Sequence, residues 1–428
     1  MQPIEDRKAA AKAPKTIFII HPSDFLTDHE PYGDGLIAFG FISKLAERGY
    51  RIHVAVKRYS IGHALPPNVT LHLLPIRVRL PLLNRLEYMI RVRLLFNRLK
   101  KTEPLDILHQ MNPVFAGLSL AFIGAGVPVV LGTIVPSWPH NPDAVAAGNP
   151  ALAGLLSFAK KVIVGLQQKR AAALLLTSPA ALNRVPNPAQ VQHKILSVPH
   201  AVDVERYSPS GVNLLPEKMP LTILFLANLS GRKGIFVLLT AFEKVSKALP
   251  TCRLRIAGGG PEAEAVAKRV ASMDCRSQIE LLGPVSREQT ADLFRASTVY
   301  CLPSFGEPHA TAVMEAMSCG IPIVATAAGG NPYLIPMGGG RLVAVGSDAE
   351  LSAALIEVLS NDDLRASMSQ VNRQYAEQRL TWDKACDALE NAYAFAAGRV
   401  TSVQSDLRPQ PLRDSRIGAQ HHHVVPNK

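Results

Sequence analysis

Two glutamates, Glu307 and Glu315, lie eight positions apart in the segment Pro303 to Ala325, PSFGEPHATAVMEAMSCGIPIVA. Glu307 follows the apolar run Thr298–Leu302, which predicts a strand, and Glu315 lies in an Ala- and Met-rich stretch that predicts a helix ending at Gly320. Unpaired backbone N–H groups and the macrodipole at a helix start favour phosphate, and nearby carboxylates accept hydrogen bonds from sugar or ribose hydroxyls. The pair is therefore a candidate ligand site, although two glutamates can also simply decorate a helix.

A second candidate is the turn Arg232–Lys233–Gly234, which separates the strand candidate Leu221–Ala227 from an amphipathic helical stretch. Cations just beyond the carboxyl end of a parallel strand lie where doubly wound folds bind their ligands. Arginine holds phosphate oxygens with paired hydrogen bonds and lysine acts as a point charge, so the two could neutralise a diphosphate leaving group without a metal. A solvated charged turn is the alternative interpretation.

Two glycine clusters also follow strand candidates. Gly258–Gly260 in RIAGGGPE and Gly33–Asp34–Gly35 in PYGDGL let the backbone come close to a ligand or a neighbouring loop. We expect the second cluster to form a loop before a helix at Ile37–Arg48. Taken alone, each cluster is equally typical of an ordinary turn.

The elements that must position these residues alternate between strand and helix along the chain. Apolar runs predict strands at Thr16–His21, Arg51–Lys57, Leu105–His109, Val127–Leu131, Ala173–Thr177 and Ile195–Pro199, then at Leu221–Ala227, Arg253–Ala257, Gln278–Leu282, Val299–Leu302 and Ile321–Thr326. Helical stretches between them indicate parallel sheets covered on both faces, an α/β architecture. Because 428 residues exceed one ordinary core, we predict two doubly wound domains that meet near Val202–Glu217.

The composition is that of a folded protein with unevenly placed charge. Hydrophobic residues make up 47% of the chain and charged residues 19%, which excludes an intrinsically disordered protein. The net charge is +12, and residues 1–205 hold 23 Lys and Arg against 13 Asp and Glu, so an acidic partner would meet the N-terminal half. Five cysteines without a CxxC pair argue against a disulfide framework or a zinc site and favour the cytoplasm.

Three segments bear on membranes. The polar start MQPIEDRKAAAKAPK predicts no signal peptide, and Gly124–Pro128 divides the uncharged run Val114–Val135 into a short helix and a buried strand. The stretch Leu74–Lys101 carries eight Arg or Lys and one Glu among apolar residues, which suggests peripheral contact with an anionic inner membrane face or a lipid phosphate. An exposed cationic helix is the alternative. The charge is not interleaved with aromatic residues, so we expect no nucleic-acid partner.

The order of these motifs resembles the retaining GT-B glycosyltransferases of family 4, the glycosyl transferases group 1, over roughly residues 16–398. Seven segments carry the resemblance: GDGL with LAERGYRIHV, LDILHQ, VPHAVDVERYSP, the RKG turn, GGGPE, LLGPVSREQTADLFRASTVYCLPS, and the glutamate pair ending in EAMSCGIPIVA. The resemblance implies two Rossmann-like domains facing across a cleft: residues 16–205 bind the acceptor, residues 206–380 bind the nucleotide sugar, and a helix at 381–398 crosses back to the first domain. Residues 1–15 are then a flexible N-terminus and 399–428 a disordered tail.

The resemblance also implies an activity and a set of site residues. The enzyme would be of the hexosyltransferase type, moving a sugar with retention from a nucleoside-diphosphate sugar to a saccharide or lipid-linked acceptor in polysaccharide or glycolipid synthesis, with no cofactor or essential metal. By matching position, Lys233 with Arg232 would contact the diphosphate, Glu307 the transferred sugar, and Glu315 the ribose. Further donor-binding positions would be Ala310, Thr311, Ala312, Gly35, Asn228 and Gly259. Acceptor-side candidates are His109, Gly33 and Asp34, and a packed histidine is the alternative for His109.

Several positions depart from the family pattern, namely Ala227–Asn228 for Gly-Arg, Pro308–His309–Ala310 for Gly-Phe-Gly, Tyr333 for Glu, and His109–Gln110–Met111 for His-x-His. Those near the expected sugar pocket leave the donor unidentified. A rival hypothesis is a non-catalytic protein on the same scaffold that binds nucleotide sugars or polyanions. The joint presence of Lys233, Glu307 and Glu315 favours an enzyme. A second rival hypothesis keeps the fold but changes the enzyme, for example to a sucrose-type synthase or a phosphorylase. A phosphorylase would need a pyridoxal-bearing lysine and a much longer chain, and the sequence shows neither.

Overall fold

The structure, a computed structural model, describes residues 15–30, 32–78, 80–113, 115–136, 150–209, 220–307 and 310–401. The first sheet consists of β1 (Thr16–Ile20), β3 (Arg51–Val56), β5 (Val69–Leu73), β6 (Ile107–Gln110), β7 (Val129–Ile134), β8 (Ala173–Leu176) and β9 (Ile195–Ser197). These strands are parallel and lie in the order β5-β3-β1-β6-β7-β8-β9. Two short strands, β2 (Leu26–Thr27) and β4 (Tyr59–Ser60), pair separately.

The second sheet consists of β10 (Thr222–Leu226), β11 (Arg253–Ala257), β12 (Ile279–Gly283), β13 (Val299–Leu302), β14 (Ile323–Thr326) and β15 (Gly340–Val343). Its strands are also parallel, in the order β12-β11-β10-β13-β14-β15. In both sheets the strand order reverses beside the first strand, at β1/β6 and at β10/β13. Such reversals open a crevice at the carboxyl ends of the strands, where doubly wound folds bind ligands.

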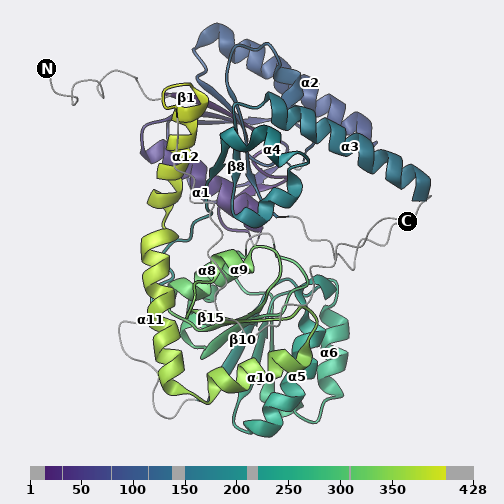
Figure 1. The fold of residues 1–428 in the computed structure, drawn as a ribbon, viewed down its shortest axis with the longest axis vertical. Coiled ribbons are helices and arrows are strands. Elements are labelled where there is room, and N and C mark those ends of the chain that lie inside the picture. Colours follow the sequence, from purple (N-terminus) through teal and green to yellow (C-terminus); the bar gives the residue numbers. More distant parts are fainter. Residues whose placement is uncertain are drawn as a thin grey trace, which may run out of the picture.

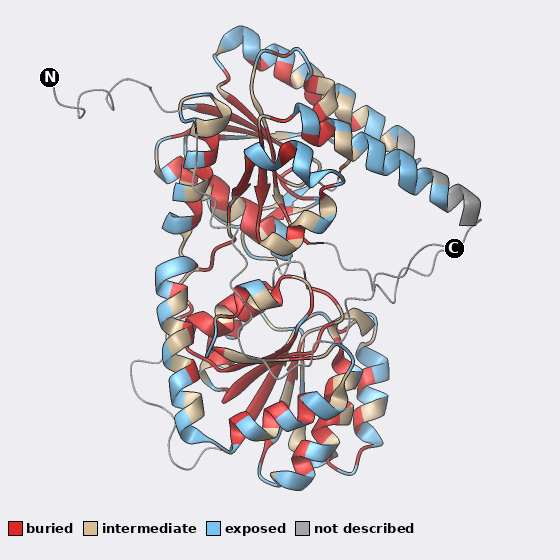
Figure 2. Cartoon of the chain, in the orientation of Figure 1, coloured by how far each residue is buried: buried red, intermediate tan, exposed pale blue. Residues whose placement is uncertain are grey.

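Helices cover the sheets (Figure 1). They are α1 (Gly33–Glu47), α2 (Pro81–Thr102), α3 (Pro150–Arg170), α4 (Pro188–Val191), α5 (Ile235–Ala248), α6 (Ala263–Ala271), α7 (Arg287–Arg295), α8 (Thr311–Ser318), α9 (Asn331–Leu334), α10 (Asp348–Leu359), α11 (Asp362–Arg379) and α12 (Trp382–Ala396). Figure 2 shows the central strands buried and many of the helices buried on one side only. This is the pattern that apolar strand runs and amphipathic helices predict for parallel sheets.

The last two helices join the domains, because α11 runs along the second domain and α12 lies against the first (Figure 1). The Trp382 ring packs edge-on against Phe41 of α1 at 5.4 Å between centroids. Arg48 at the end of α1 donates to Asp387 at 2.8 Å and to Glu390 at 2.6 Å. The predicted fold class, two Rossmann-like domains with a C-terminal helix crossing back to the first, is confirmed.

The strand predictions are confirmed for the interior of both sheets, and two edge strands were missed. β5 and β15 are only partly buried and lack a continuous apolar run. The predicted loop at Gly33–Asp34–Gly35 is wrong, because α1 already begins at Gly33. The run Val114–Val135 divides as predicted, into a 3-10 helix at Leu118–Phe122 and β7.

The predicted flexible N-terminus, residues 1–15, and the predicted disordered tail, residues 399–428, lie almost wholly outside the described residues. Within the described part of the chain, the helices are all too short or too polar to cross a bilayer. The same residues hold no cluster of three or more His, Cys, Asp or Glu side chains suited to a metal ion.

Candidate active site

A cavity of about 650 Å³ lies between the two domains at the carboxyl ends of their strands. From the C-terminal domain it is lined by Asn228, Arg232, Lys233, Gly259, Arg287, Glu307, Ala310, Thr311, Ala312 and Glu315, among others. From the N-terminal domain it is lined by His29, Gly33, Asp34, Val135 and His200, among others. The walls come close, since a Cβ added to Gly33 would lie 3.6 Å from Thr311 Oγ1. The cavity is therefore the main candidate site.

Lys233 and Glu307 form a nearly buried ion pair in this cavity. The Nζ of Lys233 lies 2.5 Å from Oε1 of Glu307, whose side chain is 3% exposed. The Nη1 of Arg232 lies 3.7 Å from the same oxygen and donates to the backbone carbonyl of Gly306 at 2.8 Å. The structure thus brings together two motifs that are 74 residues apart in sequence, as the resemblance implied.

Glycines hold these charged groups in place. Gly234 has φ of +74°, and a Cβ there would lie 1.9 Å from the carbonyl oxygen of Pro303, so the turn after Lys233 requires glycine. Gly329 has φ of +55°, and a Cβ there would lie 2.0 Å from the carbonyl oxygen of Glu307. The backbone N–H of Gly330 donates to that oxygen at 2.7 Å. The GGNPY loop therefore fixes the backbone of Glu307, a role that its motif did not reveal.

Glu315 lies on α8 and faces the cavity, where it is partly exposed. Desolvation raises the pKa of Glu315 to about 7, against the opposing charge of Arg287 and a hydrogen bond with Tyr207. The Tyr207 hydroxyl also lies 2.9 Å from Oγ1 of Thr290. The Nε of Arg287 is buried without a hydrogen-bond partner among the described residues. The motifs did not single out Tyr207 and Arg287, although RYSP and SREQ place them in segments that carry the resemblance.

The remaining predicted donor positions also line the cavity. Ala310, Thr311 and Ala312 do so where α8 begins. Asn228 and Gly259 line it from neighbouring strand ends. Their loops are in close contact, since a Cβ on the adjacent Gly258 would lie 2.0 Å from the carbonyl oxygen of Ala227. Pro308 and His309, between the two glutamates, lie outside the described residues.

The acceptor-side candidates Gly33 and Asp34 and the predicted donor-binding Gly35 are consecutive, but they lie in different surroundings. Gly33 and Asp34 line the cavity, and desolvation raises the pKa of Asp34. Gly35 is instead buried beneath them, where a Cβ would lie 2.2 Å from the carbonyl oxygen of Phe25. Its predicted place in a loop that closes over the ligands is wrong, because it lies in the first turn of α1.

His109 is a packed histidine and does not line the cavity. Its Nδ1 lies 2.7 Å from the hydroxyl of Tyr393 on α12, and its Nε2 meets the carbonyl oxygen of Gly132. Burial lowers the pKa of His109 to about 4, so the ring is neutral at pH 7. The candidate acceptor role of His109 is therefore corrected to a structural one. The next residue, Gln110, is also buried, with its side chain 2.6 Å from that of Gln167 on α3.

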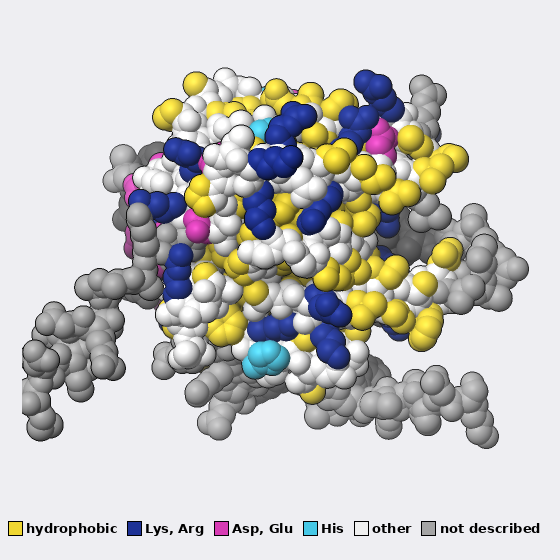
Figure 3. All heavy atoms as spheres, turned by 90° about the horizontal axis from the view of Figure 1, so that it is seen from above, with side chains coloured by type: hydrophobic (Ala, Val, Ile, Leu, Met, Phe, Trp, Pro, Cys, Tyr) yellow, Lys and Arg dark blue, Asp and Glu magenta, His cyan; other side chains and the backbone are white. Residues whose placement is uncertain are grey.

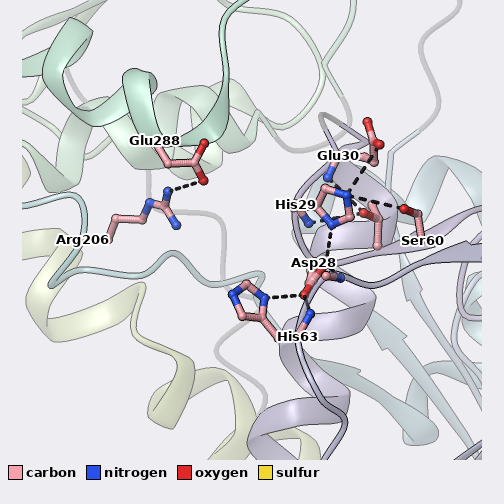
Figure 4. A network of polar contacts seen from close by, with 9 residues as sticks. Asp28, His29, Glu30, Ser60, His63, Arg206 and Glu288 are labelled. Atoms are coloured by element: carbon pink, nitrogen blue, oxygen red, sulfur yellow. Dashed lines mark hydrogen bonds and ion pairs between the residues drawn. The ribbon is translucent and has the colours of Figure 1, made fainter.

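A polar network lies at the rim of the cavity (Figure 4). Asp28 pairs with His29 at 2.6 Å and with His63 at 2.7 Å. The hydrogen bond to Asp28 raises the pKa of His29, which lines the cavity. Figure 4 shows this network of the N-terminal domain opposite the Arg206–Glu288 pair, whose charged atoms are 3.5 Å apart.

Residues 212–375 match the family model described as "Glycosyl transferases group 1". This part of the chain, residues 212–375, is a domain of the glycosyl transferases group 1. It is 28% identical over 213 residues to the D-inositol 3-phosphate glycosyltransferase of Corynebacterium jeikeium, covering 46% of this chain and 50% of that protein. It is 22% identical over 373 residues to the N-acetyl-alpha-D-glucosaminyl L-malate synthase of Bacillus anthracis, covering 84% and 93%. The matches span about half the length of the first three curated relatives.

Solved structures share the fold. The sucrose-phosphate synthase of Thermosynechococcus elongatus superposes with a TM-score of 0.69 at 17% identity, over 89% of this chain and 98% of that one. HepE of Anabaena, in complex with UDP-glucose, gives 0.66 at 18% identity, over 88% and 98%. WaaG, a glycosyltransferase involved in lipopolysaccharide biosynthesis, gives 0.66 at 19% identity, over 90% and 100%. These likenesses support the GT-B fold over nearly the whole described chain.

Proposed function

We propose that this protein transfers a glycosyl group from a nucleoside-diphosphate sugar to an acceptor hydroxyl, with retention of anomeric configuration, in polysaccharide or glycolipid synthesis. The observation that carries the proposal is the nearly buried Lys233–Glu307 pair, with Arg232 beside it, in a cavity shared by both domains. The structure of Anabaena HepE with UDP-glucose and the family match of residues 212–375 support the proposal.

In this proposal the C-terminal domain stabilises the leaving group. Negative charge grows on the diphosphate as its bond to the sugar breaks, and preorganised cations stabilise that charge. Lys233 and Arg232 supply the stabilising positive charge directly, so the proposed transfer needs no divalent metal. When the diphosphate engages Lys233, Glu307 becomes free to accept hydrogen bonds from the hydroxyls of the sugar. Glu315 accepts hydrogen bonds from the ribose.

A thermal-unfolding screen against UDP, GDP, ADP and their sugars tests the donor class. A nucleotide that binds only the folded protein stabilises it by about 2.7 kcal/mol at 100 times its Kd. We expect one base to stabilise clearly more than the other two. If none of them raises the unfolding temperature, the proposal fails. Product NMR, with and without EDTA, then tests anomeric retention and metal independence.

Peripheral membrane contact through α2 is part of the proposal. Figure 3 views the N-terminal domain end-on, where Lys and Arg side chains are mixed with apolar ones and few acidic ones. The segment Leu74–Lys101, which contains most of α2, exposes the apolar residues Leu80, Leu83, Leu86, Ile90 and Leu94. Arg98 and Lys101 are exposed beside them. In contrast, Arg91 pairs with Glu87, and Arg93 lies over the Phe96 ring.

Sedimentation with anionic liposomes tests this contact. Arg98→Glu combined with Lys101→Glu should reduce the bound fraction, because each basic residue near an anionic surface contributes about 1 kcal/mol. Lys247→Glu combined with Lys384→Glu changes the charge equally at exposed positions on α5 and α12 and is the control. Equal sedimentation of both variants and the unmodified protein would rule out α2 as the contact.

A further inference from the structure

A second cavity, of about 580 Å³, lies in the N-terminal domain between α3 and the segment 182–186. A small cavity of about 50 Å³ lies between it and the interdomain cavity and shares lining residues with each. Asp34 and His200 line both the small cavity and the interdomain cavity. Arg184 lines both the small cavity and the second one. The three cavities therefore adjoin one another through shared walls, and we call this series of cavities the acceptor channel.

One face of α3 forms a wall of the second cavity. Its lining residues recur at helical spacing: Ser157, Lys160, Lys161, Val164, Gln167 and Gln168. Gln167 fixes the helix to the sheet, since it accepts from the N–H of Gly117 at 2.7 Å and donates to Gln110 at 2.6 Å. Gln168 donates to the carbonyl oxygen of Arg184 at 3.1 Å. This hydrogen bond ties α3 to the segment 182–186, which forms the opposite wall of the cavity. The cavity is therefore preformed rather than a gap between loose segments.

The second cavity is basic. Lys160, Lys161 and Arg184 line it, and the described lining residues include no carboxylate. Among the described residues, no acidic side chain lies within ion-pair distance of these three cations. The Nε of Arg184 is buried without a hydrogen-bond partner in the same residues. Asp34 acts electrostatically on Arg184, and Lys160 and Lys161 are exposed at the cavity mouth. The three cations together leave the second cavity with net positive charge, which favours an anionic ligand.

The charge changes sign along the acceptor channel. Asp34 is the carboxylate at the junction with the interdomain cavity, near the position where the sugar would be transferred. A carboxylate there repels an anionic group and accepts a hydrogen bond from a hydroxyl. An acceptor that carries both groups would therefore bind in one direction, with its hydroxyl toward Asp34 and its anionic group toward Lys160 and Lys161.

We propose that the acceptor channel binds an acceptor with a phosphate group, holding the phosphate at Lys160, Lys161 and Arg184 and presenting a hydroxyl at Asp34. This inference rests on the proposed glycosyl transfer. The outer face of α3 exposes Leu156, Phe158, Val162, Ile163 and Leu166. The phosphate could thus belong to a soluble compound or to a lipid whose chains lie along this face.

Calorimetric titration of the full chain tests the proposal, with the donor site saturated by the nucleotide that stabilises the protein most. The soluble probes are glycerol 3-phosphate and glycerol, and the lipid probes are dioctanoyl phosphatidic acid and dioctanoylglycerol. We expect a phosphate probe to bind about tenfold or more tightly than its neutral partner. Lys160→Ala combined with Lys161→Ala should abolish that preference.

The matched control is Lys169→Ala combined with Arg170→Ala, which removes the same charge from α3 outside the second cavity and should keep the preference. Binding by both phosphate probes indicates a soluble acceptor, and binding by the lipid alone indicates a lipid acceptor. Equal affinity for charged and neutral probes, or an unchanged affinity in the Lys160 and Lys161 variant, would overturn the inference. Failure of all nucleotides to bind would instead overturn the proposed function, so the two failures differ.

Discussion

The two walls of the interdomain cavity are built in different ways. In the C-terminal domain, the charged residues predicted from the sequence meet in one place, and Lys233 lies 2.5 Å from Glu307. In the N-terminal domain, Gly33 and Asp34 line the cavity, but His109 packs against Tyr393 and is absent from the lining. Strand-end turns carry the C-terminal site, whereas long-range packing decides which residues line the N-terminal wall.

Lys233→Ala should have the largest effect. Transfer should slow by about 10²- to 10³-fold, because a preorganised charge is lost from the leaving-group site. Unfolding should also become easier by about 1–3 kcal/mol, because the nearly buried Glu307 loses its hydrogen-bonded partner and keeps only the more distant Arg232 as a counter-charge. Product assays and denaturant unfolding measure the two effects.

The control is Lys244→Ala, because Lys244 lies 2.5 Å from Asp348 in a pair that is largely exposed. That variant should change the free energy of unfolding by less than about 1 kcal/mol. Equal behaviour of the two lysine variants would contradict the special role of the cavity pair.

Gly234→Ala should destabilise the C-terminal domain by about 3 kcal/mol, because the turn combines a positive φ with a clash against Pro303. Gly231→Ala tests the same turn without either problem, since a Cβ there meets nothing within 4 Å. We expect it to change stability by about 0.5 kcal/mol or less. Denaturant unfolding of the two variants distinguishes a required glycine from a merely flexible turn.

Nucleotide affinity should depend on the ionisation of Glu315, whose pKa is raised to about 7. The ionised fraction rises about tenfold between pH 6 and pH 8, so the Kd should fall over this range if Glu315 accepts the ribose hydrogen bonds. Glu315→Gln should remove this dependence. Calorimetry at several pH values measures it, and an equally pH-dependent Kd in the variant would exclude Glu315 as the cause.

The same shift affects stability. Burial favours the protonated carboxyl, so the native state holds more protons than the unfolded state between pH 4.5 and about 7. The contribution of Glu315 to the free energy of unfolding therefore decreases as pH rises through that range. Glu315→Gln should become more stable relative to the unmodified protein as pH rises.

Tyr393→Phe should destabilise the protein by about 1–2 kcal/mol, because Nδ1 of the buried His109 loses its 2.7 Å partner. Nucleotide affinity should stay the same, since neither residue lines the cavity. Unfolding and calorimetry together check this. A change in nucleotide affinity without a change in stability would instead support a role for His109 in the site.

The sequence predicted most of what local patterns determine. Apolar runs identified the interior strands, and the RKG turn and the paired glutamates identified the C-terminal wall. The edge strands β5 and β15 were not predicted, because an edge strand has a neighbour on one side only and these two lack a continuous apolar run. The start of α1 at Gly33 was not predicted either, because glycines usually indicate a loop. Arg184 and Lys160 belong to the acceptor channel only through the packing of α3.

Hydrogen exchange with and without the stabilising nucleotide tests the central claim, that the donor binds to the C-terminal wall. We predict slower exchange at the backbone amides of Gly231–Lys233 and Ala310–Ala312, where the turn and the start of α8 line the cavity. Exchange along α3 should stay unchanged. Protection confined to the N-terminal domain, with no change in these two segments, would contradict the account.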